Sequence, residues 1–180
     1  MSKKYEIEVT GIAPLLMNRF DVAEHSEGAS KKKKKVFIAA NDAEHSCYRN
    51  KNNKLFMPNE WFFAALIKAG VKQTYEGKKT YKDIFKSGII VEPEEIVLDQ
   101  QEYEIDLRAV VNPTTRGRSV RARPKFNKWC GSFEITVLDE DLISAQVLKE
   151  ALEHAGQNGV GDYRPRFGRF MVSKFKETKA

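Results

Sequence analysis

Seven of the ten arginines in the chain lie in two short stretches, at residues 116–123 and 164–169. A guanidinium group is a planar donor that matches phosphate with two parallel hydrogen bonds and also stacks on bases. Clustered arginine therefore predicts a polyanionic partner. The structural alternative is a solvated basic face, but lysine would serve such a face equally well. The candidate binding residues are Arg116, Arg118, Arg121, Arg123, Arg164, Arg166 and Arg169.

The second stretch belongs to a glycine-rich segment, GVGDYRPRFGRF, that runs from Gly159 to Phe170. Gly159 and Gly161 allow the backbone to approach a phosphate closely, and exposed N–H groups in such a loop can bind an anion. Tyr163 has a ring on which a base can stack. The spacing is not that of a dinucleotide-binding fingerprint, because the segment follows a predicted helix rather than a strand.

The first stretch continues into Lys125, Phe126 and Trp129. Basic side chains beside aromatic rings are what a single-strand groove requires, since the charges follow the phosphates and the rings stack on bases. For Phe126 and Trp129 the alternative of core packing stays equally open. Lys125 joins the candidate contacts.

Catalytic and metal sites have little support in the sequence. His25 and His45 lie in matching AEHS segments, where surface-loop residues are the simpler interpretation. Cys47 and Cys130 lack metal-ligand spacing and are expected to be free thiols. The acidic run at residues 139–141 is explained by helix capping. We therefore predict no catalytic residue, no metal and no cofactor, and the balance is against an enzyme.

Hydrophobic periodicity predicts the elements that must position these side chains. Alternation predicts strands at residues 5–12, 132–138 and 167–175, and helical spacing predicts helices that begin near Asn59, as an N-cap, and near Leu142. Strand pieces within residues 89–98 complete the order strand, helix, strand, strand, helix, strand. This order predicts an α+β fold of the ferredoxin-like or RRM-like kind. Two main helices would cover one face of its antiparallel sheet and leave the other face free for ligands.

Two additions interrupt this order in what we expect to be a single domain of 180 residues. A long insertion at about residues 18–54 carries five adjacent lysines at 31–35, which favour a mobile loop, and a short strand or hairpin arm is expected at 36–40. An extra hairpin at about residues 104–126 carries the first arginine stretch, with Arg121 and Arg123 on one face and Arg118 on the other. Residues 71–87 are polar and lysine-rich, and they predict no clear element.

The C-terminal third, with its strand, amphipathic helix and glycine-rich loop, resembles the RAMP superfamily of CRISPR-associated proteins. The segments EVTGIAPLLMNRF and MPNEWFFAAL resemble the first strand and first helix of that family. The resemblance is strongest to phage and prophage proteins that end in GDxRPRFGRF and share an RxxPxFxxW stretch, and it covers the chain apart from residues 18–53 and 71–87. It implies a ferredoxin-like fold whose glycine-rich loop contacts RNA. The loop residues given an RNA- or DNA-contacting role in this way are Gly159, Gly161, Arg164, Arg166 and Arg169.

The hypothesis that follows is a protein that binds single-stranded RNA or DNA in the cytoplasm of a bacterium or phage-infected cell. It would assemble along the strand as RAMP backbone subunits do, as a homo-oligomer or within a multi-subunit complex. The net charge is +6, and no apolar segment is long enough to span a membrane, so no membrane partner is expected. Two alternatives stay open. One is a metal-independent endoribonuclease of RAMP type, and the other is a phage protein that mimics a CRISPR subunit and interferes with its assembly.

Overall fold

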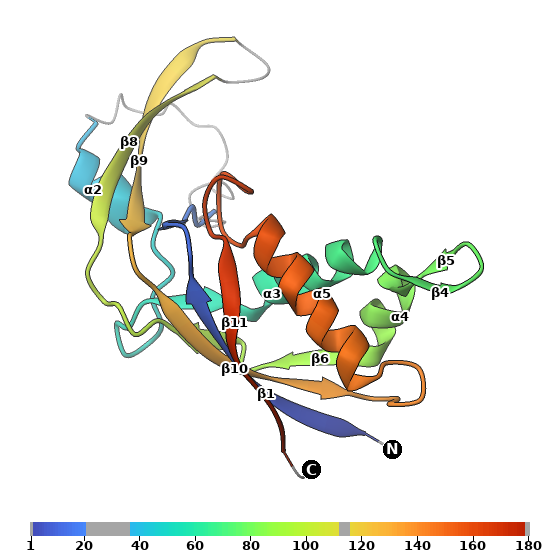
Figure 1. The fold of residues 1–180 in the computed structure, drawn as a ribbon. Coiled ribbons are helices and arrows are strands. Elements are labelled where there is room, and N and C mark those ends of the chain that lie inside the picture. The colour runs from blue at the N-terminus through green and yellow to red at the C-terminus, as the bar shows by residue number, and fades with distance from the viewer. Residues whose placement is uncertain (1, 21–36, 112–115, 179–180) are drawn as a thin grey trace, which may run out of the picture.

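The computed structural model describes residues 2–20, 37–111 and 116–178, so the lysine run at 31–35 and His25 lie outside the described residues. A four-stranded antiparallel sheet in the order β11-β1-β10-β6 forms its centre (Figure 1). In chain order, its strands and the two helices that cover it are β1 (Lys3–Gly11), α3 (Asn59–Gly70), β6 (Ile89–Glu92), β10 (Cys130–Val137), α5 (Ala145–Asn158) and β11 (Phe170–Thr178). This order and this arrangement of strands confirm the predicted ferredoxin-like fold.

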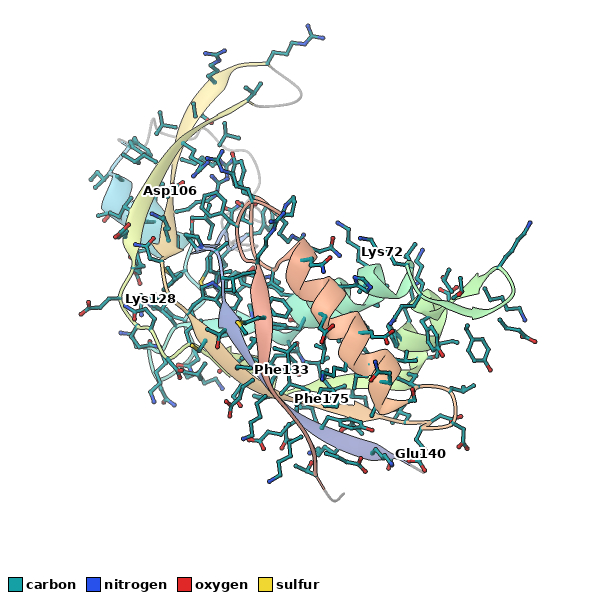
Figure 2. The ribbon with its side chains drawn as sticks, in the orientation of Figure 1. Lys72, Asp106, Lys128, Phe133, Glu140 and Phe175 are labelled. Atoms are coloured by element: carbon teal, nitrogen blue, oxygen red, sulfur yellow. The ribbon has the colours of Figure 1, made fainter. Side chains whose placement is uncertain are left out.

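Alternating side chains bury one face of this sheet beneath α3 and α5. Tyr5, Ile7 and Val9 of β1 are at most 1% exposed. Phe62 of α3 packs on Phe133 of β10, with ring centroids 4.5 Å apart, and Phe133 is labelled in Figure 2. Burial of this apolar surface is the main term that holds the helices on the sheet.

The sequence predicts that the opposite face of the sheet is left free for ligands. In the structure, charged side chains on this face instead pair with one another. Lys174 Nζ lies 2.8 Å from Glu6 Oε1 and 3.1 Å from Glu8 Oε1. Lys4 Nζ lies 2.8 Å from Glu134 Oε2. The Lys174 ammonium, through its hydrogen bond, lowers the pKa of the Glu6 carboxyl. An RRM presents aromatic rings to RNA on this face, where this chain presents ion-paired side chains.

A second sheet carries the arginine-rich hairpin, which projects from the body as a two-stranded ribbon (Figure 1). Its strands, in the order β2-β9-β8, are β2 (Leu15–Leu16), β9 (Arg118–Phe126) and β8 (Glu104–Val111). Two smaller pairs are β3 (Phe56–Pro58) with β7 (Glu95–Val97), and β4 (Thr74–Glu76) with β5 (Lys79–Thr80). The remaining helices are α2 (Ala39–His45) and α4 (Tyr81–Gly88).

Helix starts differ from the predicted ones in three places. Residues 39–40, expected in a strand or hairpin arm, begin α2, because their alanines are strong helix formers. Asn59 is the first residue of α3 rather than its N-cap, and its side-chain amide donates to Val91 O at 2.7 Å. The acidic run at 139–141 does not cap α5, whose N-cap is Ser144.

The lysine-rich residues 71–87, for which no element was predicted, form most of β4, β5 and α4. The last strand begins at Phe170, three residues after its predicted start, because Gly168 adopts a φ of 72° in the loop before it. Within the described residues, no helix is both long and apolar enough to cross a membrane.

Candidate nucleic-acid interface

The register of the β8–β9 ribbon sorts its charged side chains onto one face. Arg121 pairs with Arg108, Arg123 with Asp106, and Lys125 with Glu104. Arg118 is offset from these by an odd number of residues and lies on the other face, with Val120 and Ala122. The alternation predicted for the arginine stretch is therefore present.

Arg123 connects this ribbon to the glycine-rich loop. It is 4% exposed, and its Nε lies 2.7 Å from Asp162 Oδ2. Neither of these two atoms has a hydrogen-bond partner among the described residues, and Arg123 Nη1 has none either. The contact is thus an ion pair between the first arginine stretch and the glycine-rich loop, and its partly buried setting makes it stronger than a surface pair.

Aromatic rings complete this junction between ribbon and loop. The guanidinium carbon of Arg123 lies 5.0 Å from the centroid of the Tyr163 ring, and that of Arg108 lies 5.3 Å from it. Arg108 also lies 4.6 Å from the Phe167 ring. All three contacts are within cation–π range.

Asp106 holds Arg108 in this position. Its Oδ1 accepts from Arg108 Nη2 at 3.0 Å and its Oδ2 accepts from Nε, and this pairing raises the pKa of Arg108. Asp106 is labelled on the ribbon in Figure 2. Arg108 was missed by the sequence analysis, although its alternate position after Asp106 in a predicted strand could have indicated a shared face.

The loop backbone is pressed against the chain that follows β1. Asp162 N–H donates to Leu16 O at 3.0 Å, and Gly168 N–H donates to Pro14 O at 2.8 Å. Gly161 has a φ of 75°, and a Cβ there would lie 2.6 Å from Leu16 O. Gly159 is buried. These two predicted contact residues therefore lie where the loop packs closely on other backbone, and glycine allows that approach.

The predicted residues fall into two groups by their surroundings. Arg123 is buried against Asp162, and Lys125 Nζ lies 3.2 Å from Glu104 Oε2. The other arginines are exposed and form no ion pair with any described residue, and we call them the arginine surface: Arg116, Arg118, Arg121, Arg164, Arg166 and Arg169. Tyr163, next to Arg164, is 38% exposed. For Phe126 and Trp129 the sequence left base stacking and core packing equally open, and both side chains lie in the core.

No protein-family model matches the sequence, and no curated protein matches it. A solved structure does share the fold. It is a chain of the "Cryo-EM structure of the Type III-B Cmr-beta bound to cognate target RNA", with a TM-score of 0.64 at 10% sequence identity. The two chains share one fold. The similarity covers 99% of this chain and 61% of that one, so this chain spans about three fifths of its neighbour's length.

Candidate catalytic groups are scattered. His45 is exposed at the last turn of α2, and His154 lies in α5. Among the described residues, no group of three or more His, Cys, Asp or Glu side chains could hold a metal ion. Cys47 is buried, which raises the pKa of its thiol to about 11, and Cys130 is half-buried.

Proposed function

We propose that this protein binds single-stranded nucleic acid, RNA or ssDNA, through the arginine surface. The junction of Arg123, Asp162 and Tyr163 carries this proposal, because it places the ribbon against the loop. Arg121 lies two residues along β9 from that junction, and Arg164 directly follows Tyr163, so exposed guanidinium groups flank it on both elements. Guanidinium groups without carboxylate partners are free to bind phosphates.

We assign the buried members of the predicted site a positioning role. Arg123 and Arg108 hold the ribbon on the loop, and Gly159 and Gly161 let the loop pack closely enough to meet it. Tyr163 offers the exposed part of its ring to a base, as aromatic side chains do in single-strand sites. The solved neighbour belongs to a complex bound to target RNA. That complex supports RNA as the first ligand to test.

We further propose that copies assemble along the strand through the other face of the ribbon. Four large apolar side chains, 43–57% exposed, lie on the face that carries Arg118: Ile105, Leu107, Val111 and Val120. A ribbon with an exposed apolar face, and with β8 at the edge of the sheet formed by the described strands, is a surface that proteins usually cover with a partner.

A second copy of the chain offers an acidic surface, opposite in charge to Arg118 on this face of the ribbon. The segment from Glu92 to Glu104 contains six carboxylates and no basic residue, and Val97 within it is 41% exposed. Four of its carboxylates are exposed and form no ion pair with described residues: Glu94, Glu95, Asp99 and Glu102. Because the ribbon face and this acidic segment are different surfaces, their contact is head-to-tail, and repeated contacts build a row of copies.

Oligonucleotide binding tests the proposal. Five phosphate contacts on a single strand, with Arg118 of the assembly face left out, predict a log–log salt slope of about −3.5. The triple variant Arg121→Ala, Arg164→Ala and Arg166→Ala should reduce that slope by about 2 and weaken binding about tenfold or more. Its control, Lys51→Ala, Lys54→Ala and Lys176→Ala, removes the same charge from exposed positions elsewhere. Equal losses in the two variants would reject the arginine surface, and matched RNA and DNA strands would identify the preferred sugar.

A further inference from the structure

A second cationic region lies on α3, α4 and the β4–β5 ribbon. Residues 68–86 contain six lysines and two carboxylates, a formal charge of +4 in a chain whose total is +6. All six lysines are exposed. The two carboxylates are paired, Glu76 with Lys79 at 3.6 Å and Asp83 with Lys86 at 3.1 Å. The other four lysines form no ion pair with described residues, and we call them the lysine surface: Lys68, Lys72, Lys78 and Lys82.

The backbone brings together the segments that carry two of these lysines. Tyr81 N–H donates to Gln73 O at 3.1 Å, next to the β4–β5 pairing of Thr74 with Thr80. Lys72 directly precedes Gln73 and Lys82 directly follows Tyr81, and Figure 2 labels Lys72 where the chain leaves α3 toward the ribbon. The two ammonium groups therefore add positive charge to one region, which a polyanion would neutralise.

The segment that carries these lysines also contains an exposed aromatic ring. Tyr75 of β4 is 43% exposed, and its ring meets the Tyr81 ring edge-on with centroids 5.5 Å apart. Tyr81 in turn packs on Phe85, which is fully buried in the core. The Tyr75 ring therefore packs on the core through Tyr81, and the rest of the ring is exposed to solvent. Charges beside a supported, exposed ring are the two components of a single-strand site.

We propose that the lysine surface is a second binding site for the phosphate backbone of single-stranded nucleic acid. Figure 1 shows the β4–β5 ribbon and the β8–β9 ribbon at opposite ends of the molecule, so the two sites are separate. Lysine is a flexible point charge without the planar fork of arginine, so this site contributes affinity without selecting a base. A strand long enough to reach both sites gains from both, as in any bivalent ligand. The lysine surface shares no residue with the arginine surface, so binding at the first does not require binding at the second.

Strand length separates the two sites in a binding experiment. We expect the variant Lys72→Gln, Lys78→Gln and Lys82→Gln to bind a strand of about 8 nucleotides, the size that one module covers, within about twofold of the wild type. On a strand of about 40 nucleotides it should lose about tenfold in affinity and about 2 in salt slope. The control is Lys51→Gln, Lys54→Gln and Lys176→Gln, which makes the same change of charge at exposed positions elsewhere.

Each outcome of this experiment decides the proposal. If the lysine variant and its control bind the long strand equally well, the lysine surface is only a solvated face. If the wild type prefers vesicles rich in phosphatidylserine to either strand, the site is one for lipid phosphates and the proposal is overturned. If Arg121→Ala, Arg164→Ala and Arg166→Ala leave binding unchanged while the lysine variant weakens it, the arginine surface fails and the lysine surface stands.

Discussion

The two halves of the β8–β9 ribbon use the same residue type in opposite ways. At its base, Arg123 is 4% exposed, faces Asp162 and touches the Tyr163 ring. Toward its tip, Arg118 and Arg121 are exposed and form no ion pair with described residues. One half attaches the ribbon to the body, and the other extends away from it (Figure 1).

This contrast shows that an arginine count does not by itself define a binding surface. Arg121 and Arg123 lie on one face of one strand, two residues apart. Their difference comes from what packs against them: the loop covers Arg123 and stops short of Arg121. The charge of a buried guanidinium must be paired inside the protein, whereas an exposed guanidinium is solvated by water and available to an external anion. The contrast therefore predicts stability effects at the base and binding effects at the tip.

The largest effect is expected at the base of the ribbon, from Asp162→Ala. This change leaves the buried Arg123 guanidinium without its ion-pair partner, and we expect a loss of about 2–3 kcal/mol in the free energy of unfolding. The value lies below that for a fully buried pair because the Asp162 side chain is 30% exposed. Urea denaturation measures it, with Asp99→Ala as the control, because Asp99 is exposed and forms no ion pair within the described part of the chain.

The double variant Arg123→Met and Asp162→Ala tests the cause of that loss. Replacing both partners of a buried pair by apolar groups is often neutral, so the double variant should regain most of the stability lost in Asp162→Ala. A single variant as stable as Asp99→Ala would show that Arg123 does not need its carboxylate. The contrast between base and tip would then fail.

The next effect concerns assembly at the tip. Leu107→Gln with Val120→Gln should leave stability within about 0.5 kcal/mol, since both side chains are more than half exposed, but should abolish cooperative binding to a long strand. Leu138→Gln with Leu142→Gln changes exposed leucines elsewhere and should bind cooperatively as before. Sedimentation of the protein on RNA measures the size of the assembly.

Mixing two variants sharpens the assembly prediction. One variant carries the altered ribbon face, and the other carries Glu94→Lys, Glu95→Lys and Asp99→Lys. In a head-to-tail row each variant keeps one working surface, so the mixture should form pairs and nothing longer. Rows of full length from the mixture would mean that these two surfaces do not meet.

The overall fold was predictable because its signals are local. Alternation in β1 and β10 and the helical spacing of α3 and α5 gave the element order, and that order matches one familiar arrangement. The helices α2 and α4 were missed because their sequences are mostly polar and their apolar faces narrow. In α4, for example, only Tyr81 and Phe85 are buried.

The candidate site was predictable in part, for a physical reason. The faces of β9 follow from a period of two, so the grouping of Arg121 with Arg123 could be read from the sequence. The burial of Arg123 could not, because it depends on Asp162, 39 residues later in a different element. The charge on the open sheet face depends likewise on cross-strand neighbours, since Lys174 of β11 forms ion pairs with both Glu6 and Glu8 of β1. Such pairings are set by the assembled sheet.

The smallest effect is expected at Tyr163, which contacts a buried arginine as the base of the ribbon does and is partly exposed as the tip is. Its ring contacts Arg123 and Arg108, yet the residue is 38% exposed, so only part of the ring is open to a base. Tyr163→Leu should therefore weaken binding of a pyrimidine strand by about 1 kcal/mol, at the low end for a stacked base. Tyr163→Phe keeps the ring and should bind as the wild type does.

Stability measured on the same two variants distinguishes what the ring does. If it stacks on a base, Tyr163→Leu loses affinity while its free energy of unfolding stays within about 0.5 kcal/mol of that of Tyr163→Phe. If the ring acts only on the two guanidinium groups, the loss appears in unfolding instead, at about 1 kcal/mol for an exposed cation–π pair. In that case Tyr163 belongs with Arg123 at the base, and the arginine surface binds its strand through phosphates alone.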